Sequence, residues 1–263
     1  MENAAPRIGT STLDHLYDQC ALSATQVFDV KDFKTWIREF VRPFFAHGAL
    51  ACGLGRINSA GVSMDYVVTV DYPIELLAAI RNPAGGIDTP LMRRWLATRK
   101  PVFFDESVPS EGIGATWLEH FRRYGLRNAA VDAVFDENNC IGSYFSFHLL
   151  PTIDQEMLTR NFLALTPLLH TTLTRVIATL QQRSSELSDA FSQMTERERE
   201  IATWIGKGKG NADIALLTGL SENTVKHYLT RLLSKTGCAN RAGLAAIVVN
   251  QVHSSFGTGT KVL

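Results

Sequence analysis

The segment from Ser221 to Gly237 constrains the fold most, because its two ends and its periodicity all specify a helix. Ser221 is a favourable N-cap, Glu222 suits the positive end of a helix, and Gly237 suits the left-handed position that follows one. At about 100° per residue, the apolar residues share one arc: Val225, Tyr228, Leu229 and Leu232. The segment is therefore predicted to be an amphipathic helix with one buried side.

The opposite arc of this helix is basic and free of carboxylates: Asn223, Lys226, His227, Thr230, Arg231 and Ser234. It could lie in a DNA major groove, with Lys and Asn at base edges and Arg and Thr at phosphates. A solvated surface helix has the same composition and is the more frequent case. The helix alone leaves both interpretations open.

The flanking sequence predicts a helix-turn-helix. Thr195 and Glu198 have the spacing of a capping box at the start of a first helix. Asn211 is expected to cap a second helix that stops at Gly219, and only "GLS" separates that helix from the one beginning at Ser221. A fourth helix is expected from Asn240. Four short helices are thus predicted to form a small core that presents the third helix outward.

The net charge of zero is the sum of two opposite contributions. The chain from Phe191 onward carries nine Lys/Arg and five Asp/Glu, a net charge of +4, so that the preceding residues carry −4. A small basic module beside an acidic one favours an anionic partner for the basic module.

The segment from Met194 to Val249 resembles the DNA-binding domain of LuxR-type (GerE/NarL-like) transcription factors. The resemblance rests on many fixed spacings, formed by Thr195, Arg197, Glu198, Glu200, Asn211, Ile214, Ala215, Ser221, Thr224, Val225, Lys226, Lys235, Gly237, Asn240 and Arg241. It implies that Lys226, His227 and Thr230 face bases. It further implies a set that holds either phosphates or the domain itself: Thr224, Arg231, Lys235, Asn211 and Arg241.

Two features refine this resemblance. Glu198 is expected to be a structural cap or ion-pair partner. His227 and Tyr228 stand where the family has a small residue followed by His, so the DNA sequence preference is expected to differ from that of typical members. The resemblance implies double-stranded DNA as partner, a homodimer, and RNA polymerase if the protein activates transcription.

Residues 1–182 are predicted to be mixed α/β, so that the whole chain is α+β. The expected elements are helices over 30–45, 73–81, 88–98, 116–124 and 153–182, a strand at 101–104, and two hairpins with turns at 58–61 and 136–139. Pro167 is a candidate kink in the long helix. Five strands between helices fit a PAS/GAF-like sensor and dimerisation domain. A polar linker over 183–192, a DNA-binding domain over 193–253 and a flexible tail over 254–263 complete the expected organisation.

The layout of residues 1–182 resembles the autoinducer-binding domain of quorum-sensing regulators. The corresponding candidate ligand-binding positions are Tyr66, Leu76, Ile80, Asp88, Phe104 and Ala129. The Trp and Tyr that would bind a lactone head group are missing, and Asp88 is the one candidate for the amide-binding acid. We expect an unidentified small apolar ligand, or none, and no other cofactor. Such a chain is similar to orphan ("solo") regulators, including the EpsA type that accompanies exopolysaccharide biosynthesis genes.

Enzyme chemistry finds little support in the sequence. The seven histidines are scattered without metal-ligand spacing, "GKGKGN" lacks Walker spacing, and Asp132, Asp136 and Glu137 are expected at the solvent edge of a hairpin. No catalytic or metal-binding residue is assigned. The absence of an apolar run of roughly 18 residues, of a signal peptide and of paired cysteines predicts a cytoplasmic protein away from membranes.

Three hypotheses remain. The first is a ligand-sensing regulator. The second is a regulator whose N-terminal domain serves only to dimerise or to bind a protein partner. The third and weakest is an enzyme tethered to DNA. A buried apolar cavity would separate the first from the second.

Overall fold

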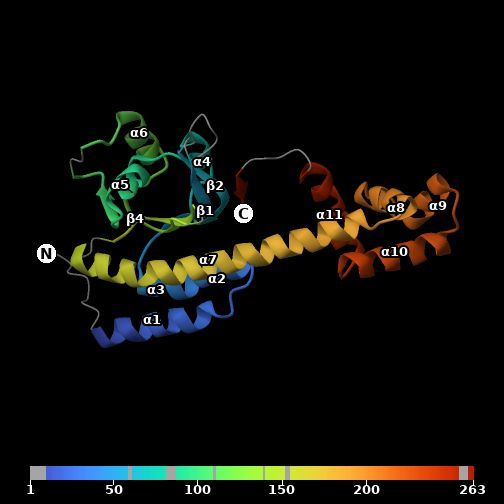
Figure 1. Cartoon of the computed structure of the whole chain (residues 1–263), viewed down its shortest axis with the longest axis horizontal. Helices are drawn as coiled ribbons and strands as arrows, with labels where there is room; N and C mark the ends of the chain where they lie inside the picture. The colour runs from blue at the N-terminus through green and yellow to red at the C-terminus, as the bar shows by residue number, and fades with distance from the viewer. Residues whose placement is uncertain are drawn as a thin grey trace. The chain divides into compact units, whose positions relative to one another are not determined.

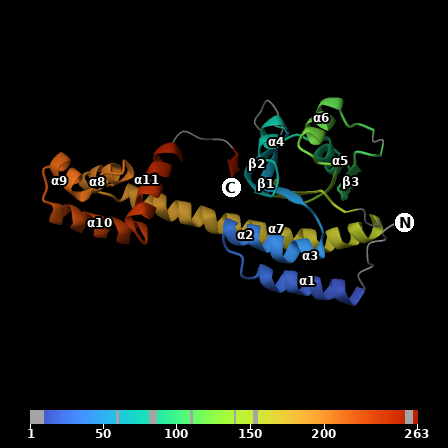
Figure 2. The ribbon, with the colours of Figure 1, turned by 180° about the vertical axis from the view of Figure 1, so that it is seen from behind.

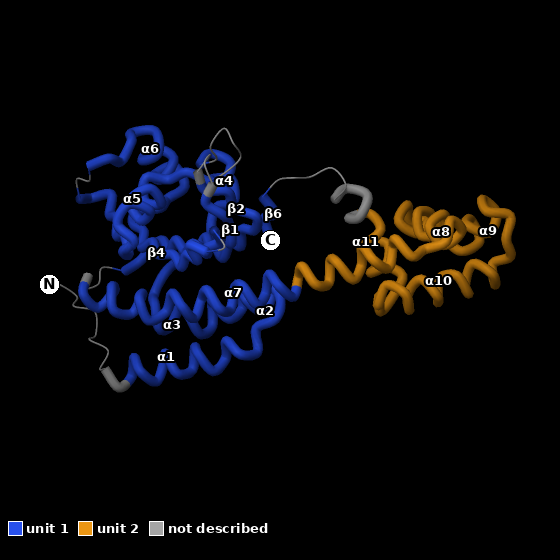
Figure 3. Tube along the Cα trace, viewed as in Figure 1, with its two compact units in different colours: residues 1–179, 259–263 blue, residues 180–258 orange. Residues whose placement is uncertain are grey.

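The computed structural model describes residues 10–58, 61–80, 87–108, 111–138, 140–151, 155–254 and 260–263. The chain divides into two compact units (Figure 3). The N-terminal unit comprises Met1–Thr179 with Gly259–Leu263, and the C-terminal unit comprises Leu180–Thr258. The first contains a sheet with helices and the second is helical, so the α+β class is confirmed.

A six-stranded sheet of order β3-β4-β5-β1-β2-β6 forms the centre of the N-terminal unit (Figure 1). Its strands are β1 (Ala49–Asn58), β2 (Gly61–Val70), β3 (Val102–Asp105), β4 (Asn128–Asp136), β5 (Ile141–His148) and β6 (Lys261–Val262). The β1–β2 and β4–β5 hairpins are confirmed, and both are antiparallel. Residues 59, 60 and 139 in the predicted turns lie outside the described residues.

Helices cover both faces of this sheet (Figures 1 and 2). One face carries α4 (Glu75–Ala79), α5 (Pro90–Thr98) and α6 (Ala115–Arg123); the other carries α2 (Val30–Trp36), the π-helical segment η1 (Ile37–Val41), α3 (Arg42–Phe44) and α7 (Gln155–Ser192). Phe45, Phe147 and Phe162 join the second layer to the sheet through ring contacts of 5.0–5.5 Å. Helix α1 (Thr10–Ala24), which we did not predict, packs against η1 and α3.

Two glycines let the backbones of β1 and β2 approach closely. A Cβ at Gly53 would lie 2.6 Å from the carbonyl oxygen of Tyr66, and one at Gly55 would lie 2.1 Å from that of Ser63. A register shift at Leu54/Gly55 marks the same place. The Met64 sulfur lies beside both glycines, at 3.2 and 2.9 Å from these Cβ positions. Larger residues would therefore displace β2.

Helix α7 is longer than predicted and includes the expected polar linker. Residues 183–192 continue the helix, because the chain from Leu168 to Ser192 contains neither Pro nor Gly and Gln182 donates to Glu186 one turn on, at 2.9 Å. The helix also continues through Pro167. By length and composition alone, residues 156–192 could cross a membrane. The buried face of α7, however, packs into the core through Phe162, Leu165 and Leu169.

The expectation of a flexible tail over 254–263 is wrong for its last part. Residues 261 and 262 form β6, parallel to β2, and the Leu263 N–H donates to the Val67 carbonyl at 2.8 Å. The strand is too short for a periodic signal in the sequence, and unpaired backbone groups at the edge of β2 supply its partners.

The C-terminal unit is built from α8 (Glu196–Gly206), α9 (Asn211–Thr218), α10 (Glu222–Thr236) and α11 (Arg241–Ser254) around a core that includes Ile201, Ile214, Val225, Leu232 and Leu244.

The predicted ends of these helices hold with one exception. The capping box of Thr195 and Glu198 is present, and the Ser221 hydroxyl accepts from the Thr224 N–H at 3.1 Å. Gly219 and Gly237 have φ of 68° and 66°, as left-handed helix stops require. The exception is Asn211, which is the first residue of α9. Gly210 is the N-cap, and its N–H donates to Asp213.

Candidate nucleic-acid interface and buried cavity

The outward face of α10 is polar, and its base-facing candidates are all exposed. Asn223, Lys226, His227 and Thr230 lie opposite the buried Val225 and Leu232, which fix the rotation of the helix. The Thr230 hydroxyl donates to the Lys226 carbonyl at 3.1 Å. The face from Asn223 to Ser234 contains hydrogen-bond donors and cations and no carboxylate.

Glu198 anchors the C-terminal end of α10 to the start of α8. Its carboxylate is 1% exposed, and it accepts from the Lys235 ammonium and the Thr195 N–H, each at 2.9 Å. The hydrogen bond from Lys235, followed by that from Thr195, lowers the pKa of Glu198 below its usual value. Arg231 lies 3.7 Å from the second carboxylate oxygen and keeps 69% of its side chain exposed.

A second polar cluster joins the loop after α8 to α11. Arg241 donates to the Asn211 side-chain oxygen at 2.8 Å and also to the Lys209 carbonyl. Of the five residues expected to hold phosphates or the domain itself, Lys235, Asn211 and Arg241 thus make contacts within the domain. Thr224 lies beside the Ser221 cap, with 2.8 Å between the hydroxyls, and Arg231 is the most exposed cation of this set.

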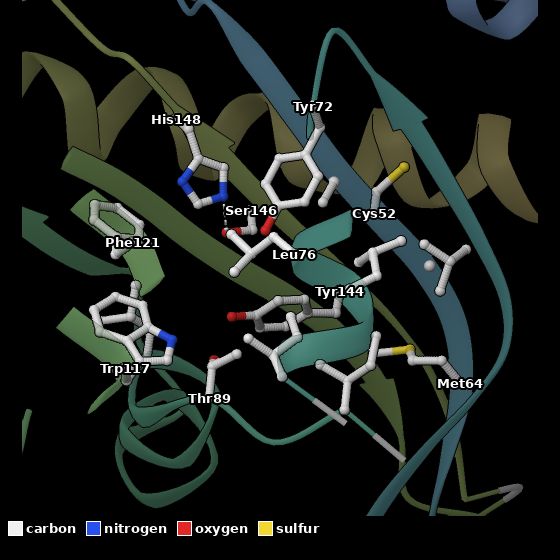
Figure 4. A pocket seen from close by; sticks show the side chains of 17 residues that line it. Cys52, Met64, Tyr72, Leu76, Thr89, Trp117, Phe121, Tyr144, Ser146 and His148 are labelled. Carbon is white, nitrogen blue, oxygen red and sulfur yellow. Dashed lines mark hydrogen bonds between the residues drawn. The ribbon is translucent and has the colours of Figure 1, made fainter. Parts of the chain in front are cut away.

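A cavity of about 50 Å³ lies between the sheet and α4–α6 of the N-terminal unit (Figure 4). Its walls are mostly apolar, and the described residues that line it contain no Asp, Glu, Lys or Arg. The side chains with hydroxyl or ring-nitrogen atoms among the lining residues are Tyr72, Thr89, Trp117, Tyr144, Ser146 and His148. A smaller cavity of about 30 Å³ shares Met64 and Tyr144 with the first.

The polar side chains of this cavity are uncharged. The Ser146 hydroxyl and His148 Nε2 are 2.8 Å apart. Burial lowers the pKa of His148 to about 3, so its ring is neutral near pH 7. Burial also raises the pKa of Tyr72 and Tyr144 above the usual value for a phenol. The site can offer neutral hydrogen bonds inside an apolar wall, and no ion pair.

Comparison with known proteins identifies the C-terminal unit. The family model described as bacterial regulatory proteins, luxR family, matches residues 192–248. These residues form a luxR-family domain.

Two relatives indicate how far the likeness extends. The probable transcriptional regulatory protein SgaR of Hyphomicrobium methylovorum is 42% identical over 62 residues, which are 24% of this chain and 29% of that protein. The transcriptional activator protein AnoR of Acinetobacter nosocomialis is 27% identical over 149 residues, or 56% of each chain. For several other curated relatives the chain spans about a third or less of their length.

A solved structure shares the fold over a larger part of the chain. It is CepR2 from Burkholderia cenocepacia, described as an N-acylhomoserine lactone dependent LuxR family transcription factor. The TM-score is 0.51 at 14% identity, covering 65% of this chain and 98% of that one. At this identity the likeness concerns the fold alone.

Outside the luxR-family domain, two of the six expected ligand-binding positions, Leu76 and Ile80, line the cavity. The Tyr66 ring faces the Lys261 ammonium at 5.6 Å, and Phe104 and Ala129 belong to the packed core. Asp88 is outside the lining because its carboxylate oxygens accept two bonds of 2.6 Å from Arg93.

Three central cavity residues, Tyr144, Ser146 and His148, are not among the ligand-binding positions predicted from the sequence. They alternate along β5, so a period of two places them on one face of the sheet. Alternation was the available signal. The choice of face, however, depends on pairing with β1, which is distant in sequence.

Asp132 corrects a further expectation. It is 6% exposed, and it accepts from the Trp95 indole N–H at 2.9 Å and from the Thr166 hydroxyl at 2.8 Å. Donors from α5 and α7 therefore compensate its burial, whereas Asp136 and Glu137 are exposed as predicted. Among the described residues, no group of three or more His, Cys, Asp or Glu could hold a metal ion.

Proposed function

We propose that the chain is a DNA-binding transcriptional regulator that places α10 in the major groove as a homodimer. The observation that carries the proposal is the outward face of α10 in a luxR-family domain. Lys226, His227 and Thr230 would contact base edges, and Arg231 would contact phosphate. The names of SgaR and AnoR, a probable transcriptional regulatory protein and a transcriptional activator, support the same class.

The N-terminal unit would act as a sensor of a small uncharged molecule. Its cavity supports this role because it joins an apolar wall to neutral polar groups at Tyr72, Ser146 and His148. A ligand would act by binding one conformation of the unit better than another. An acyl-homoserine lactone is a poor fit, because the lining has no carboxylate for the amide and Asp88 is bound to Arg93.

A second candidate has an observation in its favour. The cavity of about 50 Å³ is small beside one of about 150 Å³ that admits benzene. A regulator whose N-terminal unit only dimerises or binds a protein would need no larger cavity. In either case the protein would be cytoplasmic, would carry no catalytic activity, and would contact RNA polymerase if it activates transcription.

A mobility-shift titration tests DNA binding. The ligand-free full-length protein is titrated on DNA upstream of its own operon, with unrelated DNA as competitor. We expect Lys226→Ala to weaken specific binding, whereas Lys31→Ala, which removes an exposed Lys of the N-terminal unit, should leave it unchanged. If both variants bind like the parent, α10 does not read the site.

The same titration separates the two candidates. Tight specific binding without a ligand favours the second candidate. Weak, salt-sensitive binding favours a missing ligand.

Thermal unfolding then tests the cavity. The protein is unfolded in the presence of 1-butanol, 1-hexanol or 1-octanol and, for comparison, in the presence of the carboxylates of the same chain lengths. The alcohols should raise the Tm and the anions should not. If no alcohol raises it, the sensor role fails while the DNA-binding role stands.

A further inference from the structure

The outer edge of β2 is occupied by a segment that follows the DNA-binding domain in the chain. Tyr66 pairs with Lys261 and Val67 pairs with Val262 in a parallel ladder. The Leu263 N–H extends the ladder to the Val67 carbonyl at 2.8 Å, and the Lys261 ammonium lies 5.6 Å from the centre of the Tyr66 ring. Backbone pairing thus involves Tyr66 and Val67, and Tyr66 makes a side-chain contact as well.

This ladder is short and exposed. Val262 is 37% exposed, and β6 contains two residues. Each backbone hydrogen bond has a modest net strength, and ordering the chain opposes it. Because the free energy gained from these hydrogen bonds and the free energy lost by ordering the segment are of similar size, the segment can exchange between docked and released states.

The docked residues also belong to the cavity. Val67 lines the cavity and accepts the bond from Leu263, and Met64 lines the cavity three residues earlier in the same strand. A change in the position of this wall therefore changes the edge on which the segment docks.

We propose that the edge of β2 is a strand-docking surface whose occupant is residues 261–263 of the same chain. Docking attaches the luxR-family domain to the N-terminal unit at a second point, in addition to α7. A domain held at both ends samples fewer orientations than one held at one end. The inference goes beyond the proposed function, because docking does not depend on what the domain binds.

Hydrogen exchange of the full-length protein tests the docking. Leu263→Pro removes the N–H that donates to Val67. Leu263→Ala keeps this N–H and, like Leu263→Pro, removes the leucine side chain. We expect peptides covering 64–70 to exchange at least threefold faster in Leu263→Pro and in a chain lacking 260–263. Exchange in Leu263→Ala and in peptides covering 128–136 should match the parent. Parent-like exchange in Leu263→Pro and in the shortened chain would overturn the proposal.

Two further measurements test the second attachment. In mobility-shift titrations, the DNA affinities of Leu263→Pro and of the shortened chain should differ from that of the parent by at least threefold and in the same direction. The affinity of Leu263→Ala should lie within twofold of that of the parent. Equal affinities would overturn the proposal that docking restrains the domain.

Light scattering shows whether the docked segment belongs to the same chain or to a second copy. An unchanged mass on shortening supports docking within one chain, and a dimer that becomes monomeric would show exchange between copies and overturn it.

Discussion

The two units place their polar groups in opposite ways. The C-terminal unit turns cations and hydroxyls outward on α10, and its buried Glu198 is bonded to Thr195 and Lys235. The N-terminal unit turns neutral polar groups inward, where Ser146 and His148 face a cavity that the described part of the chain lines without Asp, Glu, Lys or Arg. The contrast teaches that one unit presents its charge to the solvent, whereas the other keeps neutral polar groups in its interior.

Removing the buried carboxylate should break the C-terminal unit most. Glu198→Ala leaves Lys235 without its partner and removes the capping box, so we expect a loss of about 3 kcal/mol in the stability of this unit. Urea unfolding of the full chain, followed by far-UV circular dichroism, measures it. Glu200→Ala is the control, because Glu200 is a partly exposed partner of Arg197 and its removal should change stability by less than about 1 kcal/mol. Equal effects would contradict a special role for Glu198.

Substitutions of the two kinds of cation on α10 should differ in how their effect on binding depends on the DNA sequence. Lys226→Ala should weaken specific binding by about 1–3 kcal/mol, whereas Arg231→Ala should weaken binding to all DNA and reduce the salt dependence. Thr230→Ala should behave like Lys226→Ala. Affinity for specific and unrelated DNA at several salt concentrations distinguishes them. Lys235→Ala should act mainly on stability, because its ammonium is bonded to Glu198.

The neutral interior of the N-terminal unit should make it sensitive to acid. Burial lowers the pKa of His148 from 6.5 to about 3, so unfolding takes up a proton between these values. Stability therefore falls as the pH falls through this window, by up to about 1.4 kcal/mol per pH unit. His148→Gln should reduce the stability difference between pH 7 and pH 5.5 by about 1 kcal/mol in urea titrations. His47→Gln should act similarly, because burial lowers the pKa of His47 to about 4. If His148→Gln shows the same stability difference between the two pH values as the parent, the His148 ring of the folded parent is already charged.

The smallest expected effect concerns an exposed apolar residue on α9 of the C-terminal unit. Leu216 on α9 is 86% exposed, so Leu216→Gln should change the stability of the C-terminal unit by less than about 0.5 kcal/mol. Ile214→Gln, two residues earlier and fully buried, is the comparison and should be strongly destabilising. Thermal unfolding of both variants measures this, and a large loss in Leu216→Gln would indicate that α9 is covered in solution.

The sequence predicted the C-terminal unit well because its signals are local. Caps at Thr195 and Ser221 and stops at Gly219 and Gly237 each act within one helix. The error at Asn211 arose because Gly210 and Asp213 form the cap one residue earlier. The two hairpins and most helices of the N-terminal unit were predicted for the same reason.

What the sequence did not predict depends on distant contacts. The cavity brings β1, β2 and β5 together with α4–α6, so no single segment contains it. Asp132 is buried because Trp95 and Thr166 reach it from two helices. The pairing of Lys261 and Val262 with β2 likewise joins residues almost 200 positions apart.

Met64 and Tyr144 lie between the two cavities, since each of them lines both. The Tyr144 ring is rigid, whereas the unbranched thioether of Met64 has several rotamers of similar energy, so Met64 is the softer part of this partition. The glycines at 53 and 55 leave it space within the hairpin without fixing it by backbone bonds. A substitution at position 64 would therefore change the partition between the two cavities while the sheet, the helix caps and α10 stay as they are.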